Sequence, residues 1–268
     1  MVSVRFESYL KSQRILKFER REMARYITLV ALLAMFAGCQ NGLNMFGAAA
    51  STADRSAGFE KSQLNQQEQE QEDDGESPLM NPELATEQAP ATFRVLVETT
   101  QGDFTIEVTR EWSPNGADRF YNMVQSGYFK DIAIFRAIDN FMFQFGIHGD
   151  PKIGGPWADL TIPDDPTLPG VGNLEGYITF AKTNQPNSRS VQFFINLRNN
   201  SALDEMGFTP FGRIVEGAEV AGKINTEYGE NPRNENVQGL FKEKGNAYIR
   251  KRFPNLDFIE SISMVENE

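Results

Sequence analysis

Residues Phe135–Pro151 read FRAIDNFMFQFGIHGDP, and they combine a run of aromatic and aliphatic side chains with one arginine, one glutamine and the only histidine of the chain. The apolar runs Ile132–Ile138 and Phe141–Phe145 predict two β-strands. Arg136 and Gln144 lie inside these runs. They are either long polar side chains that reach solvent from a buried strand or groups placed in a binding site. The residues on both sides of this stretch are needed to distinguish between these two interpretations.

Short elements continue on both sides of this stretch. Alternation within Phe93–Val108 around Gln101-Gly102 predicts a β-hairpin. Two helices are predicted, from Ser113 to Gly127 and from Ala218 to Tyr228, and the stretch Lys152–Leu174 is predicted to be an ordered loop because it is rich in Pro and Gly. The remaining predicted strands are Gly176–Ala181, Val191–Asn196, Phe211–Val215 and Phe258–Val265. Many short strands with only two helices indicate a mainly β fold, either a closed barrel or a sandwich.

The first 38 residues have the layout of a signal peptide. The arginines between residues 20 and 25 precede an uncharged apolar segment, Tyr26–Gly38, which is shorter than the roughly 20 residues that span a bilayer. The segment ends in Phe36-Ala37-Gly38-Cys39, which resembles the lipidation signal of bacterial lipoproteins, where the cysteine becomes the acylated first residue. A plain signal peptide cleaved near Ala37 is the alternative. Met23 is a second candidate for the start of the chain.

Residues 39–91 are predicted to be a lipidated cysteine followed by a disordered tether, because sequences such as NQQEQEQEDDGESP have too little apolar surface to form a core. Residues 92–268 are predicted to be the folded domain. The chain carries a net charge of −11, and the basic N-terminal segment makes the remainder more acidic still. We therefore expect no binding to nucleic acid. One cysteine and one histidine exclude an internal disulfide and the usual zinc sites.

Four motifs of the folded part occur in the order found in cyclophilins. Arg136, Phe141-Met142, Gln144 and Gly149-Asp150-Pro151 resemble the F-x-R-x-x-x-x-F-M-x-Q-x-G-D-P signature of that family. The other three stretches are Ile178–Ala181 with Pro186-Asn187-Ser188, Val191–Ile195, and Leu203-Asp204 followed by Phe211–Gly217. The resemblance as a whole runs from about Phe93 to Val265, which is the entire folded part, with the four motifs inside it. The resemblance implies a peptidyl-prolyl cis-trans isomerase on a closed eight-stranded antiparallel β-barrel that is capped by two α-helices.

The resemblance also implies the site. Arg136 is the expected catalytic donor, and Gln144 is expected to hold the substrate carbonyl or to orient Arg136. The predicted substrate-binding residues are Phe141, Met142, Ala181, Phe194, Leu203 and Phe208. Because neighbouring residues of a strand face opposite sides, only one of Phe193 and Phe194 can line the pocket. Rotation about a prolyl amide breaks no covalent bond, so no metal or other cofactor is expected.

The sequence departs from the family pattern at several positions. Phe135 stands where the family has histidine before the arginine, and Lys182 stands where it has asparagine. His148 lies in a two-residue insertion, and we expect it either to lie at the surface or to pack in a loop and to take no part in catalysis. Trp157 is expected to pack the loop that follows.

Two other functions stay open at this point. The first is a module that binds proline-containing segments without turnover, and the second is a lipoprotein that uses the barrel only as a scaffold. The presence of Arg136 favours the enzyme over the first, and the intact pocket set of Phe141, Met142, Gln144 and Phe194 argues against the second. The favoured interpretation is a monomeric isomerase on the extracytoplasmic face of a bacterial envelope, held by a lipid on Cys39. It would act on proline-containing peptides and on unfolded exported proteins.

Overall fold

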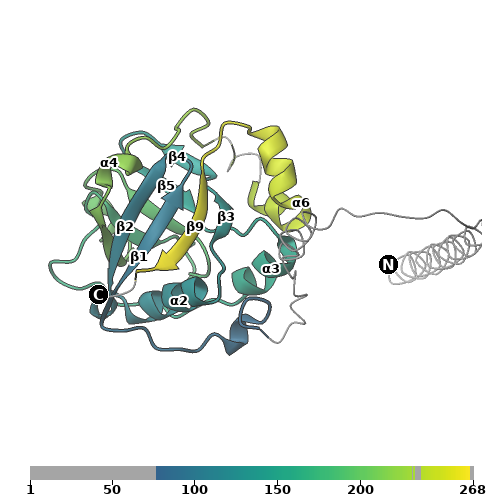
Figure 1. Ribbon diagram of the computed structural model, residues 1–268. Helices are drawn as coiled ribbons and strands as arrows, with labels where there is room; N and C mark the ends of the chain where they lie inside the picture. Colours follow the sequence, from purple (N-terminus) through teal and green to yellow (C-terminus); the bar gives the residue numbers. More distant parts are fainter. Residues whose placement is uncertain (1–76, 231, 233–236, 266–268) are drawn as a thin grey trace, which may run out of the picture. The chain divides into compact units, whose positions relative to one another are not determined.

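The computed structural model describes residues 77–230, 232 and 237–265, and within them nine strands form one antiparallel sheet (Figure 1). The order of the strands is β3-β9-β1-β2-β8-β6-β7-β5-β4. The strands are β1 (Thr92–Thr99), β2 (Gly102–Thr109), β3 (Lys130–Ala133), β4 (Arg136–Ile138), β5 (Met142–Phe145), β6 (Tyr177–Phe180), β7 (Phe193–Asn196), β8 (Pro210–Glu216) and β9 (Phe258–Met264). The predicted signal peptide, Cys39 and most of the predicted tether lie outside the described residues.

The two edge strands of the sheet, β3 and β4, are halves of one predicted strand. The chain bends at Ile134–Phe135, where the N–H of Ile134 donates to the carbonyl of Asp257 at 2.9 Å. Before the bend the chain pairs with β9, and after it the chain pairs with β5. The predicted mainly β fold is confirmed. The sheet has nine strands because the predicted strand is divided in two, and in the described residues no ladder joins β3 to β4, so the closed eight-stranded barrel stays a prediction.

The helices differ more from the prediction. The expected first helix is α2 (Pro114–Gln125), whereas α4 (Ala218–Ala221) ends much earlier than expected. The stretch predicted as a loop begins with α3 (Pro151–Asp159), because Asp150 caps its first turn by accepting a hydrogen bond from the N–H of Lys152 at 2.8 Å. A further helix, α6 (Val237–Arg252), was not predicted, and it lies against α3 (Figure 1).

The chain is ordered earlier than predicted. Residues 77–91 were assigned to the tether, yet they pack against α2, and Ala89 is buried. The side chain of Asn122 both donates to the carbonyl of Glu87 at 2.7 Å and accepts from its N–H at 3.0 Å. Asp118 accepts from the N–H of Ala89 at 2.9 Å. These polar residues of α2 satisfy backbone groups of residues 77–91, so this stretch belongs to the folded domain and not to the tether.

The main core fills the inner face of the curled sheet. Phe193 is fully buried, and its ring lies 4.4 Å from that of Phe180 and 5.4 Å from that of Phe120 on α2, measured between centroids. The neighbouring Phe194 faces the opposite side of β7, as the alternation of a strand requires. The prediction that only one of these two residues could pack inside is confirmed.

A second apolar cluster lies on the other side of β3 and β4, beneath the segment between α4 and β9. It contains Ala133, Phe135, Ile147, Phe241, Ile249, Phe253, Leu256 and Phe258. The rings of Phe135 and Phe241 are 6.2 Å apart, and both side chains are fully buried. α6 is interrupted at Gly245, whose φ is 62°. The chain passes Gly149 closely here, because a Cβ on residue 245 would lie 2.3 Å from the carbonyl oxygen of Gly149.

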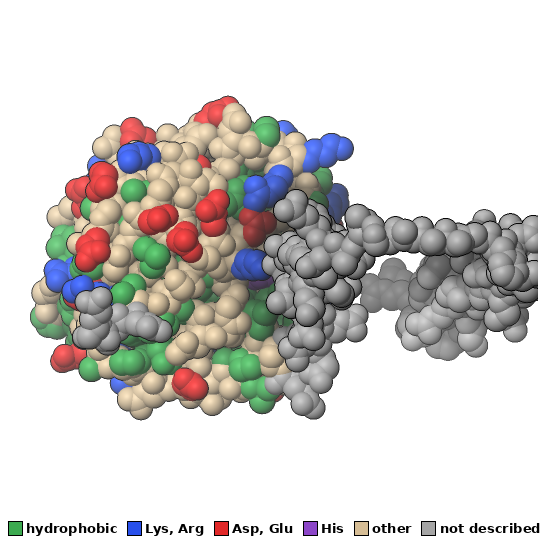
Figure 2. Space-filling model, viewed as in Figure 1, with side chains coloured by type: hydrophobic (Ala, Val, Ile, Leu, Met, Phe, Trp, Pro, Cys, Tyr) green, Lys and Arg blue, Asp and Glu red, His purple; other side chains and the backbone are tan. Residues whose placement is uncertain are grey.

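Acidic side chains are spread over the face that carries β1, β2 and β9, and apolar patches lie between them (Figure 2). This agrees with the excess of Asp and Glu in the chain. Among the described residues, no helix has the length and apolar character needed to cross a bilayer.

The burial of Phe135 yields a test of the second cluster. We expect Phe135→His to lower the free energy of unfolding by about 1–3 kcal/mol more than Phe135→Leu does, because the imidazole would lose its hydration without gaining a partner. Urea unfolding of both variants measures the difference. Equal losses would show that only side-chain volume matters at this position.

Candidate active site

The predicted site residues meet on the outer face of the sheet because of the strand register. Arg136 of β4 lies opposite Gln144 of β5, and Gln144 lies opposite Phe194 of β7. Met142 also lies on β5, two residues before Gln144. Since side chains two residues apart share one face, these four residues lie on the side of the sheet that faces away from the Phe193 core.

Arg136 is held by several neighbours. One of its terminal nitrogens, Nη1, donates to Oε1 of Gln144 at 3.1 Å and lies 3.8 Å from the sulfur of Met142. Its guanidinium carbon lies 5.9 Å from the centre of the Phe141 ring. The other terminal nitrogen, Nη2, forms an ion pair with Glu230. Arg136 therefore does not simply extend into solvent, which was the other interpretation of the sequence.

The aromatic wall continues into the loop after β7. The ring of Phe208 stands edge-on to that of Phe194 at 5.8 Å, and the N–H of Phe208 donates to the carbonyl of Leu203 at 3.2 Å. Leu203 ends the short 3₁₀-helix η3 (Ser201–Leu203). Lys182 covers the other side of the wall, with its ammonium 5.6 Å from the centre of the Phe208 ring.

Asn173 fixes this loop to the sheet. Its amide nitrogen donates to Asp204 at 2.7 Å and to the carbonyl of Phe208 at 2.8 Å, and its amide oxygen accepts from the hydroxyl of Thr179 on β6 at 2.8 Å. The side chain of Asn173 is fully buried. A buried amide whose donors and acceptor are all satisfied holds its surroundings in one arrangement. The position of Phe208 against Phe194 therefore depends on a residue that the sequence did not single out.

Gln192 was also missed. Its side-chain oxygen accepts from Nε2 of Gln144 at 2.8 Å, so an unbroken chain of hydrogen bonds runs from Gln192 through Gln144 to Arg136. The signal was present in the sequence, because Gln192 lies two residues before Phe194 and therefore on the same face of that segment. Its carbonyl accepts from the N–H of Ala181 at 2.9 Å. A bound peptide could therefore use only the carbonyl of Ala181, and not its N–H.

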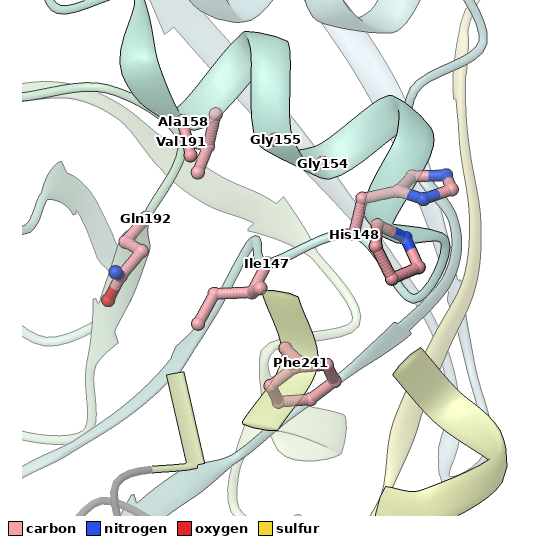
Figure 3. Close-up of a pocket in the computed structure, with 9 residues that line it drawn as sticks. Ile147, His148, Gly154, Gly155, Ala158, Val191, Gln192 and Phe241 are labelled. Atoms are coloured by element: carbon pink, nitrogen blue, oxygen red, sulfur yellow. The ribbon is translucent and has the colours of Figure 1, made fainter. Parts of the chain in front are cut away.

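A small apolar cavity lies next to this chain of hydrogen bonds (Figure 3). Gly154, Gly155 and Ala158 of α3 form one side, and Ile147 and Phe241 form another. Gln192 also lines it, although its polar end bonds to Gln144. The cavity lies between the second cluster and the site. None of the described residues that line it carries a carboxylate.

His148 lies in the wall of this cavity and is almost completely buried. Its Nδ1 accepts from the N–H of Asp150 at 2.9 Å, and its ring stands 5.1 Å from that of Tyr128. Burial lowers the pKa of His148 below its ordinary value, although the backbone of Asp150 and the carboxylates of Asp150 and Asp131 act in the opposite direction. His148 packs a loop, as predicted.

The single histidine makes this shift measurable. Because the folded-state pKa of His148 lies below the unfolded value of about 6.5, the unfolded chain binds the extra proton first, and the free energy of unfolding should fall as pH drops below about 6.5. Urea unfolding between pH 7.5 and 5.5 measures this, with His148→Gln as the variant that should lose this part of the pH dependence. An NMR titration of the imidazole with a midpoint above 6.5 would contradict the assignment.

The site consists of an arginine and two amides on an aromatic face, and the described residues contain no group of His, Cys, Asp or Glu that could hold a metal ion. This composition suits a reaction in which a donor and an apolar surface act on a peptide without covalent chemistry. A family model described as cyclophilin-type peptidyl-prolyl cis-trans isomerase matches residues 94–239, more than half of the chain. The chain therefore belongs to the cyclophilin-type peptidyl-prolyl cis-trans isomerases, as its motifs predicted.

Individual relatives agree with the family model. The chain is 32% identical to peptidyl-prolyl cis-trans isomerase A of Dickeya dadantii over 148 residues, which is 53% of this chain and 76% of the relative. It is 27% identical to peptidyl-prolyl cis-trans isomerase B of Escherichia coli over 137 residues, which is 48% of this chain and 82% of the relative. A crystal structure of a cyclophilin-type isomerase from Cryptosporidium parvum matches with a TM-score of 0.46 at 20% identity, covering 66% of this chain and 99% of the other.

Proposed function

We propose that the chain accelerates rotation about X–Pro bonds in peptides and folding proteins, with Arg136 as the catalytic residue. The observation that carries the proposal is the row Arg136–Gln144–Phe194, which places a hydrogen-bonded guanidinium beside an aromatic wall. The barrier to rotation is about 18–20 kcal/mol and comes from amide resonance. As the amide twists, its nitrogen regains a lone pair, to which a fixed N–H donor can bond.

The other residues have supporting roles in this proposal. Phe194, Met142 and Phe208 form the apolar surface against which the proline ring packs, and burial against them removes water from the amide. Gln144 orients Arg136 and is itself held by Gln192 at 2.8 Å. Donors that are already in place cost no reorganisation when the amide twists, so they stabilise the twisted amide more than the planar one.

The alternative is a module that binds proline-containing segments without turnover. The intact Arg136–Gln144 pair favours the enzyme, because a pure binding surface needs the apolar wall and does not need the donor. An assay on the purified full chain separates the two. A catalyst accelerates isomerisation of a short X–Pro peptide, whereas a binding module retains the peptide without changing its rate.

The proposed role of Arg136 can be tested by substitution. We expect Arg136→Ala to lower kcat/KM for a short X–Pro peptide on the order of 100-fold, because it removes a preorganised donor. Arg94→Ala is the matched control, since Arg94 is a half-exposed arginine on β1 that pairs with Glu107, away from the site. Full activity in the Arg136→Ala variant would remove Arg136 from the mechanism.

We further propose that the chain is a monomer and that a lipid on Cys39 holds it on the extracytoplasmic face of a bacterial membrane, where exported proteins fold. The support is the apolar segment Tyr26–Gly38, followed by the only cysteine of the chain. More than 30 residues lie between Cys39 and Ser77, the first residue that the structure describes. That length of polar chain is sufficient to hold the domain away from the lipid surface.

The anchor has its own test. Mass spectrometry of the protein extracted from membranes should show an acylated N-terminal Cys39, because removal of the signal peptide leaves the lipidated cysteine as the first residue. In the Cys39→Ser variant the acyl mass should be absent and the protein should leave the membrane fraction. An unmodified mature form in the soluble fraction of the wild type would contradict the proposal.

A further inference from the structure

Glu230 contacts the catalytic arginine from a part of the chain that none of the family motifs covers. Nη2 of Arg136 donates to Oε1 of Glu230, across 94 positions of the sequence. The side chain of Arg136 is 16% exposed and that of Glu230 is 35% exposed, so the pair lies at the rim of the site and is partly withdrawn from water. Ion pairs in such positions are screened less than pairs on an open surface.

The backbone that leads to Glu230 is anchored before a turn and within it. The N–H of Gly229 donates to the carbonyl of Thr226 at 3.0 Å, which closes the turn directly before Glu230. The ring of Tyr228 stands 5.3 Å from that of Phe253 in the second cluster. Asn225 donates from its backbone to Asp257 at 2.6 Å and from its side chain to the carbonyl of Asn255 at 2.8 Å. Glu230 therefore starts from a fixed position.

The two partners of Arg136 hold its guanidinium at different nitrogens. Gln144 binds Nη1 at 3.1 Å and Glu230 binds Nη2, whereas Nε is buried without a hydrogen-bond partner. A planar guanidinium fixed at two corners can no longer rotate about its last side-chain bonds. It has five N–H donors, so one bond to each partner leaves donors for the substrate. Glu230 does not have to move away for the reaction to occur.

We propose that Glu230 is a positioning residue, which holds the guanidinium of Arg136 in the orientation that the twisted amide requires. The inference rests on the proposed function and extends it to a segment outside the family motifs. Gln144 supplies a neutral partner from the sheet, and Glu230 supplies a charged partner from the segment between α4 and β9. Without Glu230, the amide of Gln144 would be the only described hydrogen-bond acceptor, other than the Met142 sulfur, that holds the guanidinium head.

The test compares the full chain with Glu230→Gln and Glu230→Ala, using the same X–Pro peptide over a range of concentrations. We expect kcat to fall on the order of 10-fold, because a less restrained guanidinium is misplaced for part of the time. KM should change less than about 2-fold, since the apolar wall that binds proline is untouched. Glu219→Gln is the matched control: Glu219 is an exposed glutamate on α4, whose contacts are with β2.

Two further measurements separate positioning from a merely structural role. In the Arg136→Ala background, Glu230→Ala should cause no further loss, because Glu230 acts through Arg136. The NMR signals of the guanidinium of Arg136, identified by their absence in Arg136→Ala, should be resolved in the wild type and averaged in Glu230→Gln.

Several results would overturn the inference. Faster turnover in the Glu230 variants would show that the carboxylate restrains Arg136, and unchanged kcat would show that the ion pair has no role. A full additional loss in the Arg136→Ala background would show that Glu230 acts by another route. If the proposed function itself is wrong, the wild type and Arg136→Ala will isomerise the peptide at equal rates. That result would also remove the role of Glu230.

Discussion

The pairing register of β5 is the constraint on which the site depends. Gln144 has Arg136 on one side and Phe194 on the other only because β5 pairs with β4 and β7 in this register. A slip by one residue would turn Gln144 into the core and bring Phe143 or Phe145 to the outer face. The slip is prevented by burial, since Phe143 and Phe145 are both fully buried against the Phe193 core. The chemistry on one face of the strand is therefore fixed by the hydrophobic effect on the other.

The loop beside β7 is likewise held in place by buried contacts that lie outside the site itself. Phe208 can stand against Phe194 only if the loop that carries it is held, and no strand pairing does this. Buried amides do so instead: Asn173 joins Thr179 of the sheet to Asp204 and to the backbone of Phe208. Such groups cost free energy when they are left unpaired, so a network in which every member is bonded favours one loop conformation over others.

The sequence predicted those parts of the molecule that short-range pattern and the family motifs determine. The opposite faces of Phe193 and Phe194 follow from the period of a strand, and Arg136, Gln144 and Phe194 were placed by their motifs. α3 was missed because Gly154, Gly155 and Pro156 disfavour a helix more strongly than Asp150-Pro151 favours the start of one. The helix is stabilised by the burial of Trp157, which is a tertiary contact that the local sequence does not show. α6 gives a weak helical pattern because Gly245 interrupts it. Residue 230 could not be assigned to the site, because no local pattern relates it to Arg136.

Phe135, a departure from the family pattern, is connected to Glu230 in the structure. Phe135, which stands in place of the family histidine, is buried against Phe241 of α6. That contact is part of the cluster beneath the segment between α4 and β9, and the same cluster includes Phe253, on which Tyr228 packs. Tyr228 lies two residues before Glu230, and Glu230 forms an ion pair with Arg136. Arg136 follows Phe135 directly in the sequence. A polar residue at position 135 would weaken the apolar surface on which the segment rests, so the phenylalanine helps to hold the backbone that carries the glutamate.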